Sequence, residues 1–413
     1  MKRAGWIFIV LALCIMVGCK EEQGKTGDRV SEADDVKMQI AEKQSGMFPK
    51  FSCGGATTVM LREDGTVWAW GRNNVGGLGN GTLKDSETPV RVLELTDIVD
   101  IVSGGAHRLA LKKDGTVWGW GGNEYGALGT GTKFDNHIPV KIEGLKDIIH
   151  IAAGCCHSLA LQKDGTVWVW GHNSNGQIGD GTTTDRLTPV KVEGLTGVKK
   201  LAAGRAHTLA LKKDGTVWAW GRNEKGQLGD GTNEERLTPV QVVNTAGDGV
   251  LSGITFIEAG GSYVGNSVAI TENRELLIWG DNDDSQIGDG EENKYKSKNI
   301  PHKITDVDNV VSAGVGGQFI VALKADGTVW AWGYNWDGQL GDGSDNEHRS
   351  KPVRVHGLTD ITTISVGTSH TFATDREGNV WAWGDNYFNV LGDGNGSPPN
   401  TPIKVNREFF PNN

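Results

Sequence analysis

The sequence predicts an all-β fold, a seven-bladed β-propeller built of four-stranded antiparallel blades. One segment recurs seven times, and the spacing of 50 residues between the Asp-Gly pairs at Asp64, Asp114, Asp164 and Asp214 sets its period. Each copy divides into four short stretches with the length and patterning of strands. The 413 residues include 61 Gly and 15 Trp, which fits tight turns between strands that bury large rings. Such self-similarity indicates a repeat architecture.

The second copy illustrates how one repeat divides into strands. Residues 98–103 are mostly apolar, as expected of an inner strand, and residues 107–113 alternate between apolar and polar positions. The Asp-Gly pair that follows offers positive-φ positions for a tight hairpin turn. Residues 116–121 return from that turn with two tryptophans on one face. After a Gly-rich loop, residues 139–142 predict a short outer strand, because a sheet edge tolerates its proline.

A unit of this kind cannot bury its tryptophan-bearing face alone. Packed radially, each unit covers its neighbour, which gives a seven-bladed ring. We expect the ring to close without a covalent clasp between the strand that contains Phe51 and the strand that ends at Val405. The longest departure from the period, residues 243–253, should lengthen a loop on the face opposite the Gly-rich loops.

The repeat also resembles a known family. Each full copy reads Asp-Gly-Thr-Val-Trp-x-Trp-Gly and continues as Asn-x-x-Gly-Gln-Leu-Gly, or a close variant. This block resembles the regulator of chromosome condensation repeat family, and the resemblance covers residues 47–405. It implies the same seven-bladed propeller. It implies little about function, because the family includes a nucleotide exchange factor for a small GTPase, ubiquitin-ligase modules and a secreted bacterial β-lactamase inhibitor.

The N-terminus has the pattern of a targeting segment. Lys2 and Arg3 precede an apolar run over 6–17 that is too short for a permanent membrane span. Its end at Cys19 resembles a bacterial lipoprotein signal, in which that cysteine is acylated, although Met16 departs from the usual leucine. An ordinary secretory signal is the alternative. We therefore expect a signal peptide over 1–19, a flexible polar tether over 20–46 and the propeller over 47–413. The mature chain should be extracytoplasmic, a monomer in the bacterial cell envelope, and should touch the membrane only through the lipid.

Composition and motifs exclude several functions. A net charge of −10 argues against nucleic-acid binding, which needs a basic face. No motif brings together a nucleophile and a base, and none indicates a cofactor or a metal, so we predict that the protein is not an enzyme. Residues 281–292 resemble a calcium loop but carry Gln286 where glycine is required. Four histidines recur at one repeat position, which predicts a structural hydrogen bond that closes the Gly-rich turn; they are His107, His157, His207 and His370.

The cysteines of the repeats are too few for a disulfide framework. Apart from Cys14 and Cys19 in the signal, the chain contains Cys53, Cys155 and Cys156. We interpret the adjacent pair as small buried residues beside a tight turn, with a strained vicinal disulfide as the alternative.

The copies differ most at the two positions that follow each repeat asparagine. These positions should form a ring around one end of the propeller, because the loops after the first and third strands lie on the same face. Copies six, seven, one and two, which are contiguous in a closed ring, place apolar residues there, whereas copies three to five place polar ones. The residues are Trp336, Tyr387, Phe388, Val75 and Tyr125. Exposed aromatic side chains are typical of binding hot spots.

The sequence therefore predicts a lipid-anchored scaffold that binds a macromolecule, most plausibly a protein, through one loop face. Three alternatives stay open: inhibition of an envelope or secreted enzyme, carbohydrate binding, and guanine-nucleotide exchange, which the family name alone suggests.

Overall fold

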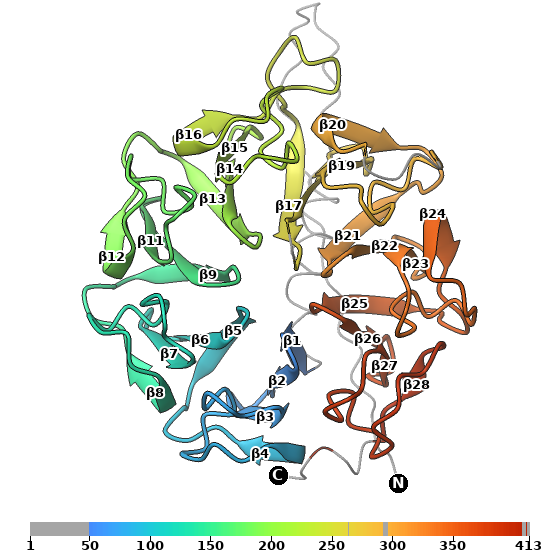
Figure 1. Ribbon diagram of the computed structural model, residues 1–413. Helices are drawn as coiled ribbons and strands as arrows, with labels where there is room; N and C mark the ends of the chain where they lie inside the picture. The colour runs from blue at the N-terminus through green and yellow to red at the C-terminus, as the bar shows by residue number, and fades with distance from the viewer. Residues whose placement is uncertain (1–48, 263, 292–295, 407–409, 411–413) are drawn as a thin grey trace, which may run out of the picture. The chain divides into compact units, whose positions relative to one another are not determined.

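The described part of the chain comprises residues 49–262, 264–291, 296–406 and 410 of a computed structural model. It forms seven four-stranded antiparallel sheets arranged around a central channel, and no helix occurs among these residues (Figure 1). This confirms the predicted propeller. The predicted signal peptide and the whole predicted tether lie within residues 1–48, outside the described residues, and stay predictions.

Each blade takes its four strands from one continuous stretch of chain, ordered from the channel outward. The inner strands are β1 (Lys50–Gly54), β5 (Ile98–Ser103), β9 (Ile148–Ala153), β13 (Val198–Ala203), β17 (Ile254–Gly260), β21 (Val310–Val315) and β25 (Ile361–Val366). The second strands are β2 (Thr57–Leu61), β6 (His107–Lys112), β10 (His157–Gln162), β14 (His207–Lys212), β18 (Asn266–Thr271), β22 (Phe319–Lys324) and β26 (His370–Asp375).

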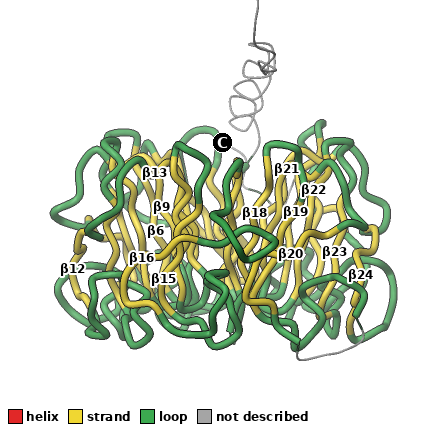
Figure 2. The backbone as a smooth tube through the Cα atoms, turned by 90° about the horizontal axis from the view of Figure 1, so that it is seen from above, coloured by secondary structure: helices red, strands yellow, loops and turns green. Residues whose placement is uncertain are grey.

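The third strands carry the tryptophans and the outer strands complete each blade. The third strands are β3 (Val67–Gly71), β7 (Val117–Gly121), β11 (Val167–Gly171), β15 (Val217–Gly221), β19 (Leu276–Gly280), β23 (Val329–Tyr334) and β27 (Val380–Gly384). The outer strands are β4 (Ser86–Arg91), β8 (Asn136–Lys141), β12 (Arg186–Lys191), β16 (Arg236–Gln241), β20 (Lys298–Ile304), β24 (His348–Arg354) and β28 (Ile403–Lys404). Seen from the side, the strands run between two faces made of loops (Figure 2).

The second and third strands are joined by a tight hairpin turn, as predicted, but only one residue of the Asp-Gly pair has a positive φ. In blade 2, Gly115 N donates to Lys112 O at 2.9 Å and Lys112 N donates to Thr116 O at 2.9 Å. Only the glycine has a positive φ, of 80°. This is a type I turn followed by a glycine bulge. The aspartate instead accepts hydrogen bonds from the backbone and hydroxyl of Thr116.

The core lies between blades rather than within them. Each of seven apolar clusters combines residues of two adjacent blades, and each contains one fully buried tryptophan, the one that directly precedes a glycine in every third strand. Its indole Nε1 donates to a backbone carbonyl in the loop of the preceding blade; for example, Trp170 donates to Ala127 O at 2.8 Å. A large apolar ring and a directed hydrogen bond therefore fix each blade on its neighbour.

The repeated histidines also connect blades. His107 Nε2 lies 2.8 Å from Ser158 Oγ of the next blade, and that hydroxyl donates its single proton to Ala127 O at 2.8 Å. The imidazole Nε2–H must therefore be the donor to the serine. His157, His207 and His370 make the equivalent contact with a Ser or Thr of the following blade, at 3.0–3.1 Å. The Gly-rich turn is closed by the backbone of the histidine, as where Gly104 N donates to His107 O at 2.9 Å, whereas the imidazole ring, contrary to expectation, reaches across the interface.

The interface between blades 1 and 2 is built differently. Arg108 occupies the hydroxyl position, fully buried, and donates to His107 O at 2.9 Å and to Gly54 O at 3.3 Å. Its Nε has no hydrogen-bond partner among the described residues. Burial lowers the pKa of this guanidinium to about 10. Gly77, where most other blades have a larger residue, leaves room for the side chain.

The ring closes between blades 7 and 1 through side chains. Phe51 stacks on Phe372 with ring centroids 4.5 Å apart, and Trp70 Nε1 donates to Val390 O at 2.8 Å. His370 Nε2 lies 3.1 Å from Thr58 Oγ1, as at the other histidine interfaces. No strand of one end of the described chain joins the sheet of the other, because blade 1 contains only β1 to β4 and blade 7 only β25 to β28.

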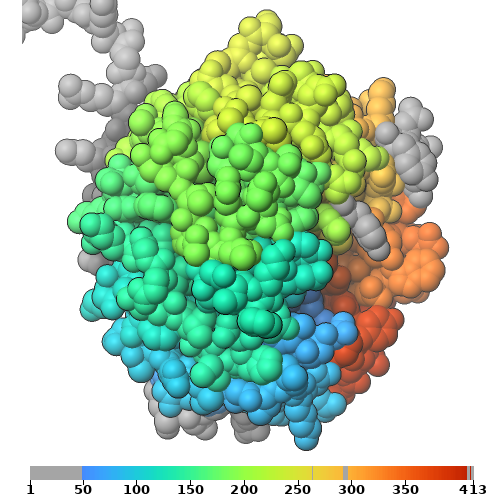
Figure 3. Space-filling view, turned by 60° about the vertical axis from the view of Figure 1, so that its left-hand side comes forward, coloured from blue at the N-terminus to red at the C-terminus, as the bar shows by residue number. Residues whose placement is uncertain are grey.

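The insertion between blades 4 and 5 protrudes from the rim (Figure 3). Val243 and Val250 form an isolated bridge, and Asn244 and Asp248 contact each other within the loop that it closes. Within the described ranges, no helix has the length and apolar character needed to cross a membrane.

Candidate functional site: the loop face and the central channel

The loop face is defined here as the end of the propeller that carries the long loops between third and fourth strands. In blade 6 this loop covers 335–347 and in blade 7 it covers 385–402. The short turns between first and second strands lie at the same end, because alternate connections of a meander fall on the same side. The positions that vary between copies are therefore gathered on one surface.

Three of the predicted binding residues are exposed on that face. Trp336 is 65% exposed, Tyr387 66% and Phe388 38%, and none of the three contributes to an apolar cluster of the core. Their neighbours hold them near one another. The Tyr387 side chain forms a hydrogen bond with the Asp337 side chain of the preceding blade. The centre of the Phe388 ring lies 5.4 Å from the guanidinium carbon of Arg72 in blade 1.

The other two predicted residues are half-buried. The Tyr125 ring packs against His172 of blade 3, with ring centroids 4.3 Å apart, and Lys133 lies 6.0 Å from its centre. Val75 lies against the backbone of blade 2 near Gly122. We call the five residues Trp336, Tyr387, Phe388, Val75 and Tyr125 the aromatic arc. Its exposed apolar area comes mainly from blades 6 and 7, and blades 1 and 2 extend it.

One exposed aromatic residue of this loop face was missed from the sequence. Phe134, in the loop of blade 2, is 80% exposed, the largest exposure among the large apolar side chains. The corresponding positions of blades 1, 3 and 4 hold Lys84, Thr184 and Glu234. Comparing the copies eleven residues after each repeat asparagine, rather than one and two, would have found it.

Blades 4 and 5 present charged pairs on the same face. Lys225 Nζ lies 2.7 Å from Asp283 Oδ1 and 3.6 Å from Asp281 Oδ1. These two carboxylates head the segment that resembles a calcium loop, and they share the lysine as a counter-ion. The Ile287 backbone N–H donates to Asn282 Oδ1 at 3.0 Å, which is the contact that organises the loop in the other blades. The face is thus apolar on one side and polar on the other.

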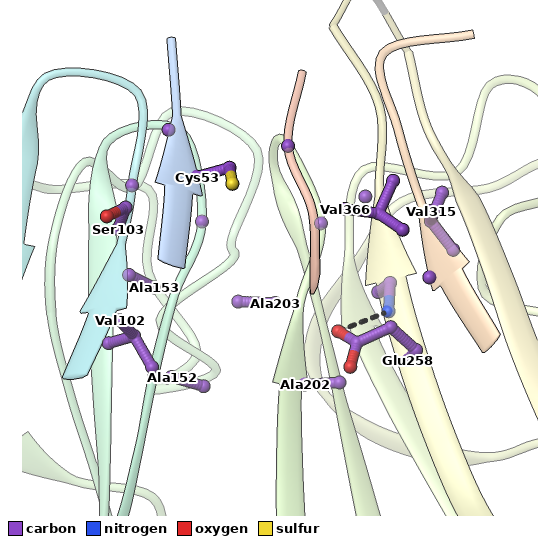
Figure 4. A pocket seen from close by; sticks show the side chains of 18 of the residues that line it. Cys53, Val102, Ser103, Ala152, Ala153, Ala202, Ala203, Glu258, Val315 and Val366 are labelled. Atoms are coloured by element: carbon purple, nitrogen blue, oxygen red, sulfur yellow. Dashed lines mark hydrogen bonds between the residues drawn. The ribbon is translucent and has the colours of Figure 1, made fainter. Parts of the chain in front are cut away.

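The central channel forms a cavity with a volume of about 580 Å³. Its half nearer the loop face is lined by small side chains such as Ala152 and Ala202, with Val315 and Val366 opposite and Cys53 close to the mouth (Figure 4). The inner strands converge there. A glycine such as Gly154 is required, because a Cβ would overlap both the His157 ring and the Gly204 carbonyl.

Charged groups line the channel at two levels: Glu258 lies beside Ala202 (Figure 4), whereas Asp100, His150 and Lys200 lie two residues further from the loop face along their strands. Lys200 Nζ lies 3.7 Å from the centre of the Phe256 ring. Desolvation lowers the pKa of Lys200 and raises the pKa of Asp100 and of Glu258, and it lowers the pKa of His150 to about 4. Glu258 accepts a hydrogen bond from the Ala259 N–H at 3.2 Å. The channel thus contains groups of both signs and offers no surface of one sign to a charged ligand.

The repeat geometry identifies the class of protein, and comparison with known proteins gives the family. The model of the RCC1-like domain family matches residues 14–322 and 197–412, so the chain belongs to that family. Three solved propellers are similar in fold. Prp20p from Saccharomyces cerevisiae, a structure reported with binding to Gsp1p and histones, has a TM-score of 0.73 and 24% identity, with 90% of each chain covered. The same yeast protein bound to Kap60 has a TM-score of 0.74 and 22% identity, with 96% of this chain and 92% of that chain covered. Human WBSCR16 has a TM-score of 0.72 and 24% identity, with 83% and 94% covered.

Curated relatives match over shorter segments. The E3 ubiquitin-protein ligase HERC2 of Homo sapiens is 34% identical over 139 residues, which are 33% of this chain and 3% of that protein. The ultraviolet-B receptor UVR8 of Arabidopsis thaliana is 33% identical over 141 residues, 33% of this chain and 31% of the receptor. The matched part thus spans at most about a third of these relatives. The likenesses establish a shared propeller.

Proposed function

We propose that this propeller is a protein-binding module whose aromatic arc docks the partner. The exposure of Trp336 and Tyr387 on adjacent loops carries the proposal. Exposed Trp and Tyr side chains contribute large apolar area at low entropic cost, and they are enriched among residues that dominate binding energy. The Arg72 guanidinium beside Phe388 adds a group that interfaces also favour.

The known structures support a protein partner in a limited way. Prp20p is reported with binding to Gsp1p and histones and with Kap60, which are proteins. Those observations belong to the yeast protein, and here they support only the suitability of the scaffold. We propose further that the chain is exported and anchored by a lipid on Cys19, as its N-terminal pattern suggests. An acidic net charge of −10 agrees with a protein rather than a nucleic-acid ligand.

Affinity capture with matched variants tests the binding surface. The full chain is compared with Trp336→Ala/Tyr387→Ala/Phe388→Ala and with Ile149→Ala/Val311→Ala. The control pair removes apolar side chains of 53% and 42% exposure from the starts of two inner strands, at the end opposite the loop face. A captured protein is then purified and its Kd for all three chains is measured. Each anchor should contribute about 2 kcal/mol, and the sum of about 6 kcal/mol corresponds to binding roughly ten-thousandfold weaker in the triple variant, while the control should bind like wild type.

Equal Kd values for the triple variant and wild type would refute docking through the arc. Loss of binding in the control pair alone would place the interface at the opposite end. Retention of a glycan in place of a protein would favour the carbohydrate-binding alternative, and stimulated nucleotide release from a captured GTPase would favour exchange. Lipid attachment is tested separately, because Cys19→Ser should move the chain from the membrane fraction to the soluble fraction.

A further inference from the structure

Two adjacent cysteines occupy a turn of the loop face at the rim of the channel. The turn between β9 and β10 reads Gly154-Cys155-Cys156, whereas the preceding blade has two glycines and an alanine at these positions. The sequence interpretation of two buried residues was wrong, because both are half-exposed and both are free thiols. Their Sγ atoms are 3.2 Å apart. Neither belongs to an apolar cluster, so packing does not account for them.

The backbone of both cysteines is held by neighbouring segments. Cys155 O accepts a hydrogen bond from Gly105 N of the preceding blade at 3.0 Å, and Cys156 O accepts one from His172 N at 2.9 Å. The two Cβ positions are therefore fixed, and the thiols meet with little freedom to separate. Such preorganisation favours a reaction that involves both sulfurs.

The surroundings favour a thiolate on one sulfur. The pKa of Cys155 is lowered to about 6, because the Cys156 thiol donates a hydrogen bond to it and Arg205 of the next blade is nearby. Burial opposes this effect only in part. Cys53 provides the contrast within the same chain: it is buried, and desolvation raises its pKa to about 12. The Cys155 thiol is thus activated for reaction as a thiolate, whereas the buried Cys53 thiol is not.

We propose that Cys155 and Cys156 form a thiol–disulfide exchange site whose substrates are low-molecular-weight disulfides. The size of the substrate follows from the position of the pair. Cys155 lines the wall of the central channel, and a cavity of about 580 Å³ admits a small molecule but not a folded domain. This inference is independent of the docking role of the aromatic arc.

The reaction proceeds in two displacements. The Cys155 thiolate attacks one sulfur of the substrate disulfide; a new bond forms between Cys155 Sγ and that sulfur, the substrate S–S bond breaks, and a thiolate leaves. Cys156 then loses its proton and attacks Cys155 Sγ, which forms the Cys155–Cys156 disulfide and releases the second substrate thiolate. The two thiolates take up the two protons lost by the cysteines. The protein pair is oxidised by two electrons and the substrate disulfide is reduced to two thiols.

Reaction with an aromatic disulfide that releases a coloured thiolate tests the proposal. In the full chain, the segment that contains the pair should release two coloured thiolates and become lighter by two hydrogen atoms, with no reagent attached. The rate should reach half its maximum at a lower pH than the rate of an ordinary thiol, whose pKa is about 8.5. At pH 6 the pair should react severalfold faster than an ordinary thiol, since a larger thiolate fraction outweighs the lower nucleophilicity. Glutathione disulfide should give the same final product.

Variants separate this mechanism from reactivity of two independent thiols. Cys156→Ala should trap one reagent molecule on Cys155 and move the half-maximal pH upward, because the hydrogen-bond donor is removed. Cys155→Ala should abolish the fast reaction, and Cys53→Ala should leave it unchanged. The proposal is overturned if wild type retains a reagent molecule on each cysteine. It is also overturned if the pair reacts only as fast as Cys53, at the rate of unfolding.

Discussion

Two threonines at the same position of the repeat should respond oppositely to the same substitution. Thr208 and Thr371 are both fully buried at the start of a second strand. The Thr208 hydroxyl donates to Gln177 O at 2.9 Å and lies 3.1 Å from His157 Nε2. The Thr371 hydroxyl has no hydrogen-bond partner among the described residues, because the preceding blade carries Phe319 in place of histidine. Valine is close to threonine in shape, so the substitution removes the hydroxyl with little change in packing.

The structure sets the size of each effect. Thr208→Val removes two hydrogen bonds worth about 1 kcal/mol each. It also leaves the His157 ring without any partner, because its Nδ1 has none, which adds about 1 kcal/mol or more. Gln177 O keeps the bond from Trp220 Nε1 at 2.9 Å and is not orphaned. We therefore expect a loss of about 2–4 kcal/mol in the free energy of unfolding. Thr371→Val removes an unsatisfied buried hydroxyl and should stabilise by about 1 kcal/mol.

Equilibrium unfolding in urea, followed by tryptophan fluorescence, measures both variants. The midpoint should fall for Thr208→Val and rise for Thr371→Val, with unchanged slopes. The double variant should show the sum of the two changes, because blades 4 and 7 do not touch. If Thr371→Val destabilises the protein as much as Thr208→Val does, hydrogen bonding at this position is not what distinguishes the interfaces.

Three further outcomes are expected. Burial lowers the pKa of the repeated histidines to about 3–4 in the folded chain, whereas an unfolded histidine has a pKa near 6.5. Between these two values the unfolded chain binds more protons than the folded chain, so a falling pH favours unfolding. Stability should therefore be full above pH 6.5 and decline as the pH falls toward 4, and His207→Asn should make the decline shallower in urea titrations at several pH values. Gly77→Gln should destabilise by about 1–3 kcal/mol by crowding Arg108, whereas adding Arg108→Thr should restore most of the loss, and additive effects would contradict this packing. Gly154→Ala should prevent a stable fold, since its Cβ overlaps backbone, while Gly144→Ala should cost only about 1 kcal/mol, as its Cβ meets nothing within 4 Å; thermal melts compare the two.

The fold was predictable because tryptophans and turns recur at fixed spacing. The direction of the histidine hydrogen bonds was not, because it depends on contacts between copies rather than within one. A signal was nevertheless present in the sequence. Each histidine copy is followed by a copy with Ser or Thr at the next position, as in His107 and Ser158, and His370 of the last copy pairs with Thr58 of the first.

Prediction of the candidate site was limited by neighbours that only the structure places. Tyr125 and Tyr387 occupy the same variable part of the repeat, yet Tyr125 is half-buried and Tyr387 is exposed. The difference lies in the position within the repeat, because Tyr387 directly follows the repeat asparagine and Tyr125 stands one residue further on. The first position is exposed in six of the seven blades, whereas the second is half-buried in six and lies against the adjoining blade, where Tyr125 meets the His172 ring.

The junction between blades 7 and 1 would allow the blades to be encoded in a circularly permuted order. It uses the same tryptophan and histidine hydrogen bonds as the other histidine interfaces, together with the Phe51–Phe372 stack, and no strand is shared between the two ends of the ring. The six residues between β8 and β9 already join one outer strand to the next inner strand. A comparable linker from β28 to β1 would allow a circularly permuted gene to begin at any blade and still encode every interface. Each blade of the ring packs against a neighbour on both sides, so the first blade is first only in the sequence.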